Sequence, residues 1–185
     1  MMQIQELRKQ IAATLTKNKV LKLTEIVKRK DLKVKDLLDL TFDTNQQIGF
    51  RAAWILENLL LDDPTVVLES LDELLLRFPK VVNPSYQRHY AKIWMYVTSP
   101  KANPIIKSKL EATNLEPVVE ICFDWLINPK VAVAVKVFCC EILFNLRNRY
   151  DWLTDELARK TEFLMKDGSA AMQSRGKKIL KQLQK

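Results

Sequence analysis

The 185-residue sequence contains only three glycines, Gly49, Gly168 and Gly176. Glycine-rich loops that cradle phosphates are therefore nearly excluded, and so are the glycine-rich turns of most β-sandwiches. No apolar run approaches the ~18 residues of a membrane-spanning helix. Residues 1–9 carry charges where a secretion signal needs an apolar core. We therefore expect a cytoplasmic protein with no membrane partner.

Metal-binding and redox residues are also few. The chain has one histidine, His89, and three cysteines, Cys122, Cys139 and Cys140, in apolar surroundings without a Cys-x-x-Cys pair. Neighbouring thiols on one helix point about 100° apart, which disfavours a disulfide, so we expect reduced core cysteines. His89 is far from them in sequence, and we predict no metal site, no cofactor and no small-molecule substrate. The histidine itself is expected at the surface or in a groove.

The sequence is rich in apolar side chains at helical spacing, and apolar residues make up 48% of it. Lys17-Asn18-Lys19 is expected to break the first helix from the second, and Ile26 and Phe42 are expected to face the core. With Asn, Asp and Pro as end signals, the pattern predicts a helix over about 3–17, a lysine-rich helix ending near 31, and further helices over about 35–43, 48–62, 64–78, 84–98, 105–112, 116–127, 130–147, 152–166 and 169–184.

One stretch is ambiguous between helix and strand. Residues 131–137 alternate Val with smaller or polar side chains, as a half-buried strand does. An unbroken stretch of roughly 17 residues is longer than a typical strand, which favours the helix. Since that helix would be apolar almost all round, we expect it to be buried between neighbours.

A short apolar pattern recurs along the chain. Ile55-Leu56-Glu57-Asn58-Leu59 returns as residues 142–146 and 179–183, with a degenerate copy at 93–97. Successive copies begin 38, 49 and 37 residues apart, and the short helix near 104–112 accounts for the long step. A period of this size with two helices per unit is typical of helical solenoids, because one helix pair cannot bury its apolar stripe alone.

On this pattern the chain resembles the HEAT-like repeat family, best over 35–185 and least over 1–34. Second helices of that family often carry a basic residue just before the apolar stripe, and Arg51 and Arg175 each stand four residues before the repeated isoleucine. The resemblance implies an all-α fold, a right-handed α-α superhelix of about five stacked pairs forming a single domain over residues 1–185. It also implies a scaffold rather than an enzyme.

In such arrays the second helices usually line the concave face. We therefore predict a common groove that binds a protein partner with acidic segments, because arginine and tryptophan suit carboxylate contacts and stacking. The alternative for the tryptophans is core packing. The candidate groove residues are Arg51, Trp54, Arg88, His89, Lys92, Lys136, Arg175 and Lys178.

The sequence is compatible with two other functions. Residues 1–35 hold ten Lys/Arg against three Asp/Glu, and residues 159–185 hold eight against two, which suits nucleic acid as well as a solvated terminal face. A helical DNA glycosylase, similar to HEAT-like alkylation-repair proteins, is the enzymatic form of that alternative. Residues 168–175 also resemble, at Gly168, Ser169 and Met172, a loop of the adenylosuccinate lyase superfamily. A plain turn with Ser169 as a helix cap explains the same residues.

Overall fold

The computed structural model describes residues 4–13, 16–29 and 33–184, and its contacts divide the chain into two compact units, Met1–Ile93 and Trp94–Lys185. The described residues form eleven α-helices and two short 3-10 helices, with no strand among them. The prediction of an all-α protein built from helix pairs is confirmed. None of the described helices combines the length and apolar character needed to cross a lipid bilayer.

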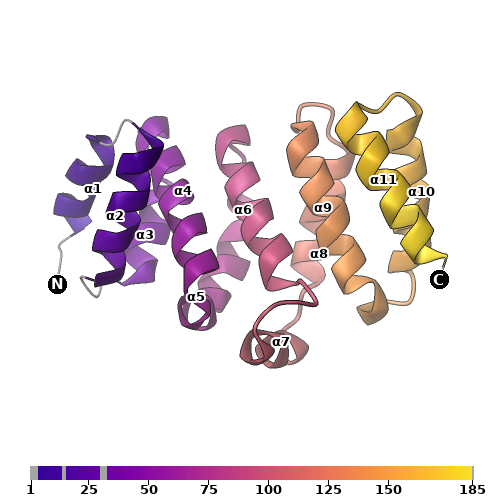
Figure 1. The fold of residues 1–185 in the computed structure, drawn as a ribbon, viewed down its shortest axis with the longest axis horizontal. Helices are drawn as coiled ribbons and strands as arrows, with labels where there is room; N and C mark the ends of the chain where they lie inside the picture. The colour runs from indigo at the N-terminus through magenta and orange to yellow at the C-terminus, as the bar shows by residue number, and fades with distance from the viewer. Residues whose placement is uncertain (1–3, 14–15, 30–32, 185) are drawn as a thin grey trace. The chain divides into compact units, whose positions relative to one another are not determined.

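The first unit places alternate helices in two layers. Its helices are α1 (Ile4–Ala12), α2 (Lys17–Arg29), α3 (Val34–Leu40), α4 (Gln46–Asp62), α5 (Pro64–Arg77) and the first part of α6 (Pro84–Val97), with the 3-10 helix η1 (Phe78–Lys80) between the last two. In Figure 1, α2 and α4 lie side by side with α3 behind them, and α3 also contacts α5. The layers enclose fully buried side chains, among them Leu37, Leu38, Ile55, Leu56 and Leu60.

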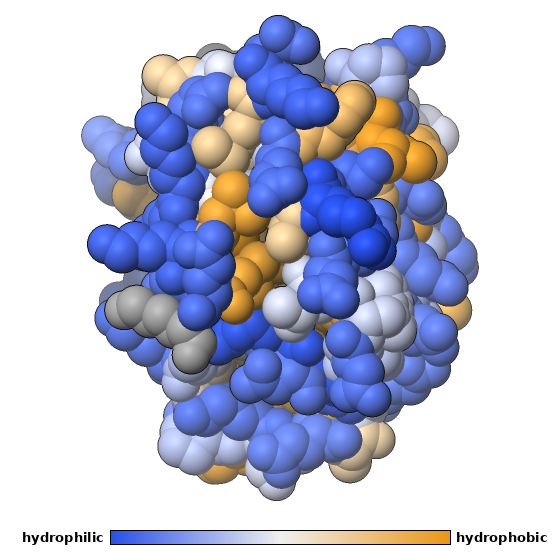
Figure 2. Space-filling model, turned by 90° about the vertical axis from the view of Figure 1, so that its right-hand side faces the viewer, coloured by the Kyte–Doolittle hydropathy of each residue, from blue (hydrophilic) through white to orange (hydrophobic). Residues whose placement is uncertain are grey.

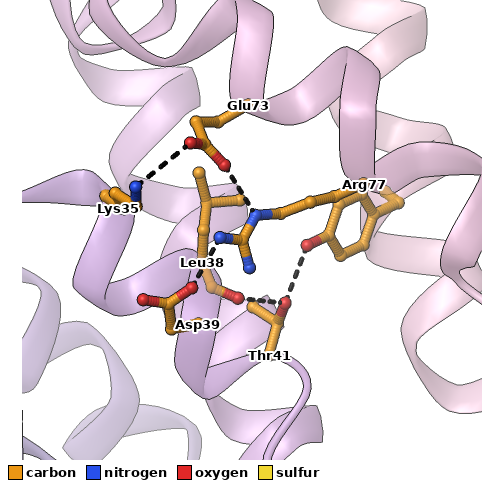
Figure 3. Close-up of polar contacts among 7 residues, drawn as sticks. Lys35, Leu38, Asp39, Thr41, Glu73 and Arg77 are labelled. Atoms are coloured by element: carbon orange, nitrogen blue, oxygen red, sulfur yellow. Dashed lines mark hydrogen bonds and ion pairs between the residues drawn. The ribbon is translucent and has the colours of Figure 1, made fainter.

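Polar contacts lock α3 against α5 (Figure 3). The guanidinium of Arg77 donates to Asp39 (2.5 Å) and to Glu73 (3.0 Å), and Lys35 reaches Glu73 at 3.5 Å. Burial disfavours the charged guanidinium and lowers the pKa of Arg77, but the hydrogen bonds to Asp39 and Glu73 outweigh burial, so the pKa is raised. On the neighbouring helix, Tyr90 lies 2.7 Å from the Thr41 hydroxyl. The start of α6 is thereby tied to the end of α3.

The second unit is built around α9. After the end of α6 it contains α7 (Pro104–Glu111), α8 (Glu116–Ile127), α9 (Val133–Leu146), the 3-10 helix η2 (Arg147–Arg149), α10 (Leu153–Lys166) and α11 (Ala170–Leu183). Helix α9 contacts α8, α10 and α11, which is why its apolar residues surround it. The alternating stretch is helical from Val133 onward, as predicted, and all three cysteines are buried and form no disulfide.

The α10–α11 end of this unit faces solvent. Figure 2 shows that face as largely hydrophilic, with a narrow apolar strip between polar side chains. A terminal repeat needs such a polar outer face to stay soluble.

Several helix ends lie where the sequence predicts them. The side chain of Asn45 accepts hydrogen bonds from the backbone N–H groups of Gln47 and Ile48 and caps α4, and α5 begins at Pro64. Ser169 accepts from the Met172 N–H at the start of α11. The short stretch that resembles a lyase loop therefore forms a turn and a helix cap.

Other predictions are wrong. Helix α2 begins at Lys17, so Lys17-Asn18-Lys19 is its first turn and not a break. The Thr16 hydroxyl accepts from the Lys19 N–H at 3.4 Å and supplies the missed start signal. Ile26 and Phe42 are exposed rather than inward-facing. The first helix ends at Ala12 and not near residue 17 as predicted, while the predicted end of the second helix near 31 lies outside the described residues.

Candidate functional site

A buried carboxylate joins two predicted site residues in the first unit. Glu57 on α4 is only 6% exposed, and its Oε2 lies 2.7 Å from Nδ1 of His89 while its Oε1 accepts from Nζ of Lys92 at 2.5 Å. Because an ionised carboxylate only accepts, Nδ1 of the histidine carries the proton. Burial would raise the pKa of Glu57, but the hydrogen bonds from His89 and Lys92 outweigh it and lower the pKa.

Two aromatic rings of α4 cover the histidine. The ring of Phe50 lies 5.1 Å from that of His89, and the ring of Trp54 stacks on it at 6.2 Å with a 22° angle between planes. His89 is itself buried at 7% exposure. The expectation that this histidine lies at the surface or in a groove is therefore wrong: it is packed between aromatic rings and bonded to an acid.

A pocket of about 410 Å³ opens beside these rings. Arg51 lines it, and NH1 of this side chain donates to the backbone carbonyls of Ile11 (3.3 Å) and Ala12 (2.8 Å) at the end of α1. Within the part of the chain that the structure describes, Nε and NH2 of the same guanidinium make no hydrogen bond. The pocket lining comes from α4, the start of α2 and the start of α6, namely Thr16, Val20, Gln46, Gln47, Phe50, Arg51, Trp54 and Ser85.

The predicted groove residues separate into several environments. Arg51 and Trp54 line the pocket, and His89 and Lys92 are held by Glu57. Arg88 is exposed, forms no ion pair with a described residue, and stands one turn after Ser85 of the pocket rim.

The remaining three predicted residues belong to the second unit. Arg175 forms an ion pair with Glu141 at 2.5 Å. Lys136 is half-buried and lines a separate pocket of about 290 Å³, and desolvation lowers its pKa. Lys178 is exposed. The common groove thus stays a prediction, whereas the grouping of Arg51 with Trp54 is visible in the structure.

Sequence reasoning missed Phe50 and Glu57 as members of the site. A signal for Glu57 was present: it is the charged residue inside the apolar stretch 55–59. A charge on the buried stripe of a helix requires a partner, so it indicates a polar contact on a neighbouring helix. Among the described residues, no group of three or more His, Cys, Asp or Glu side chains could hold a metal ion.

Comparison with known proteins agrees with the helix-pair architecture. The sequence matches the HEAT repeat domain family over residues 7–183, nearly the whole chain. The comparison with curated proteins found no match, and neither did the comparison with solved structures. With this match and with the paired helices of both units, the chain belongs to the HEAT repeat domain family.

Proposed function

We propose that the protein is a non-enzymatic binding module, and that the pocket of the first unit holds an acidic, aromatic-bearing segment of a protein partner. The proposal rests on the contacts of Arg51. Its NH1 donates to carbonyls at the end of α1, whereas its Nε and NH2 make no hydrogen bond to a described residue and line the pocket together with the rings of Phe50 and Trp54. An anchored guanidinium loses little freedom on binding, and its planar fork fits a carboxylate.

The surroundings of the pocket fit the same partner. Phe50 and Trp54 are half-buried and offer apolar area to a partner side chain, while the amides of Gln46 and Gln47 provide polar contacts at the rim. Aromatic and arginine side chains dominate the binding energy of most protein interfaces. The exposed charge of Arg88 near the rim adds attraction for an acidic segment.

The test uses labelled synthetic peptides that alternate glutamate with phenylalanine or tyrosine, titrated by fluorescence anisotropy. Arg88→Glu should weaken binding about 3- to 10-fold, since it reverses a rim charge. Lys130→Glu, an exposed change in the second unit with the same effect on net charge, should leave the affinity nearly unchanged. Equal weakening by both variants would mean unspecific attraction to a chain of net charge +8 and would refute the pocket.

Arg51 needs a separate design because it also contacts α1. Arg51→Gln removes the charge and the fork, so peptide binding should fall about tenfold or more. Thermal unfolding of the same variant separates this loss from the weakened hold on the Ile11 and Ala12 carbonyls. A variant that unfolds at a lower temperature but binds the peptide as the wild type does would remove Arg51 from the proposed contact.

Nucleic-acid binding is the second candidate, and α2 favours it. This helix exposes Lys17, Lys19, Lys22, Lys28 and Arg29 within the strongly basic first 35 residues. If several of these side chains contact phosphates, the affinity should fall steeply with salt. On duplex DNA the logarithm of the binding constant falls with the logarithm of the salt concentration, with a slope of about −0.9 per phosphate neutralised. A gel shift with duplex and single-stranded DNA at low salt tests it, and no shift would remove this candidate.

A further inference from the structure

A cluster of three aromatic rings lies at the surface of the second unit, apart from the pocket of the first. Trp152, which precedes α10, has its ring centroid 5.9 Å from that of Phe123 on α8 and 6.2 Å from that of Tyr150. Trp152 is 50% exposed, and the other two side chains are half-buried. A large, exposed tryptophan supported by two further rings is the kind of anchor found at the centre of protein interfaces.

Four acidic residues lie close in sequence to the three rings, and they are called the acidic frame here. Glu120 lies one helical turn before Phe123 on the same side of α8. Asp124 is the residue directly after Phe123. Asp151 separates Tyr150 from Trp152, and Asp155 lies one turn further along α10. All four carboxylates are exposed, and none forms an ion pair with a described residue; the acidic frame consists of Glu120, Asp124, Asp151 and Asp155.

The nearest basic group on α10 does not neutralise this frame. Arg159 forms its ion pair with Glu156 at 2.8 Å, and although Asp155 also contributes to the raised pKa of Arg159, the hydrogen bond to Glu156 is the main cause. Arg147 and Arg149, which precede Tyr150, donate to backbone carbonyls and to no carboxylate of the frame. The frame therefore keeps four carboxylates without an ion pair to a described residue, in a chain whose net charge is +8.

We infer that this surface, the three rings with their acidic frame, binds a lysine- and arginine-rich segment of a partner protein. The carboxylates attract cationic side chains, and the faces of Trp152, Tyr150 and Phe123 can receive a guanidinium or ammonium by cation–π contact. The same carboxylates repel phosphates and acidic peptides, so the ligand inferred for this surface is opposite in charge to the acidic segment proposed for the first unit's pocket.

The net charge of +8 makes the test demanding, because the chain as a whole repels a basic peptide. The probe is a fluorescein-labelled nine-residue peptide of alternating Arg/Lys and Gly/Ser, titrated by anisotropy against the full chain in low salt. Wild type should bind it saturably, and Asp151→Lys with Asp155→Lys should weaken binding at least tenfold. The matched control, Glu69→Lys with Asp72→Lys on α5, reverses two exposed charges of the first unit and should change the affinity less than twofold.

A second pair of variants tests the rings. Trp152→Ala should weaken binding of the basic peptide about fivefold with the helical circular dichroism unchanged, and Trp152→Phe should recover part of it. Arg88→Glu in the first unit should not weaken binding of the basic peptide, although it should weaken binding of the acidic peptide. The two titrations therefore distinguish a failure of this inference from a failure of the proposed function. Absence of saturable binding by wild type, or equal loss in the α5 control, would overturn it.

The basic residues of a second copy offer similar chemistry, so sedimentation is measured in parallel. Wild type should remain monomeric over the concentrations used for the titration. Concentration-dependent dimers that disappear with Asp151→Lys and Asp155→Lys, combined with no binding of the peptide, would show that the surface joins copies of this chain and would overturn the inference.

Discussion

Replacement of Glu57 by glutamine should destabilise the first unit in a way that depends on pH. Glutamine keeps the shape of the side chain but loses the charge, and its amide donors oppose the donors of His89 and Lys92. Breaking a buried ion pair costs about 3–5 kcal/mol, and a hydrogen bond to a charged group contributes about 1.5–3 kcal/mol. Since the Lys92 side chain is 39% exposed and can be rehydrated, we expect about 2–3 kcal/mol at pH 7.

The pH dependence follows from the lowered pKa of Glu57. A carboxyl whose pKa is lower in the folded state stabilises the protein fully above its unfolded pKa of about 4.3, and this contribution is lost as the pH falls through the folded value. The stability difference between wild type and Glu57→Gln should therefore shrink as the pH falls below about 4.

Urea unfolding at pH 7, 5 and 3.5, followed by tryptophan fluorescence, measures this difference, because Trp54 stacks on the affected histidine. A loss of this size corresponds to roughly 4–12 °C in melting temperature. Glu73→Gln is the control: its pKa is also lowered, by the hydrogen bond from Arg77, but the ion pair lies at the surface and its loss should matter clearly less. A Glu57→Gln penalty that stays constant down to pH 3.5 would refute the reasoning.

Three further predictions concern packing and reactivity. Gly49→Ala should cost about 1–3 kcal/mol in thermal or urea unfolding, because a Cβ there would lie 2.5 Å from Oη of Tyr86; an unchanged midpoint would contradict the close packing of α4 on α6. Arg149→Ala should cost about 1–3 kcal/mol and speed amide exchange in α7, since its guanidinium binds three backbone carbonyls at the end of that helix; exchange as slow as in wild type would exclude that role. Native alkylation at pH 8 should leave all three cysteines unmodified, because all three are buried and burial raises the pKa of the Cys139 and Cys140 thiols, to about 12 for Cys140; rapid modification detected by mass spectrometry would show that α8 and α9 open.

The features that sequence predicted well are local. Asn45, Pro64 and Ser169 act on backbone groups within a few residues of themselves, so their meaning does not depend on the rest of the fold. The wrong prediction of a helix break at Lys17 also has a local origin. Lysine is unfavourable at a positively polarised helix start, and the weak cap by Thr16 overcomes that preference only together with the packing of α2 on α4.

The site could be predicted only in part, because its key contacts join residues far apart in sequence. Glu57 is 32 residues from His89 and 35 from Lys92, and the spacing of neither pair follows from helical periodicity. Sequence placed a histidine, a lysine and a tryptophan on second helices but could not decide which of them face solvent. The acid that gathers two of them was visible only as an unusual charge in an apolar stretch.

The basic residues that recur along the sequence have a structural role. The sequence pattern does not reveal this role, but their contacts in the structure do. Arg51 of α4 binds the end of α1, His89 of α6 bonds to Glu57 of α4, and Arg175 of α11 binds Glu141 of α9. In each case a basic residue on a second helix, four residues before the repeated isoleucine, bonds to an earlier helix of the same unit, so the period of these residues reflects helix-to-helix contacts. Lys136 stands six rather than four residues before the repeated Ile142, and it forms no ion pair with an acid among the described residues. A repeated basic residue in such a chain is therefore evidence for ligand binding only where some of its hydrogen-bond donors make no bond to another helix. Among the predicted residues of the first unit, Arg88 meets this condition, and so do Nε and NH2 of Arg51.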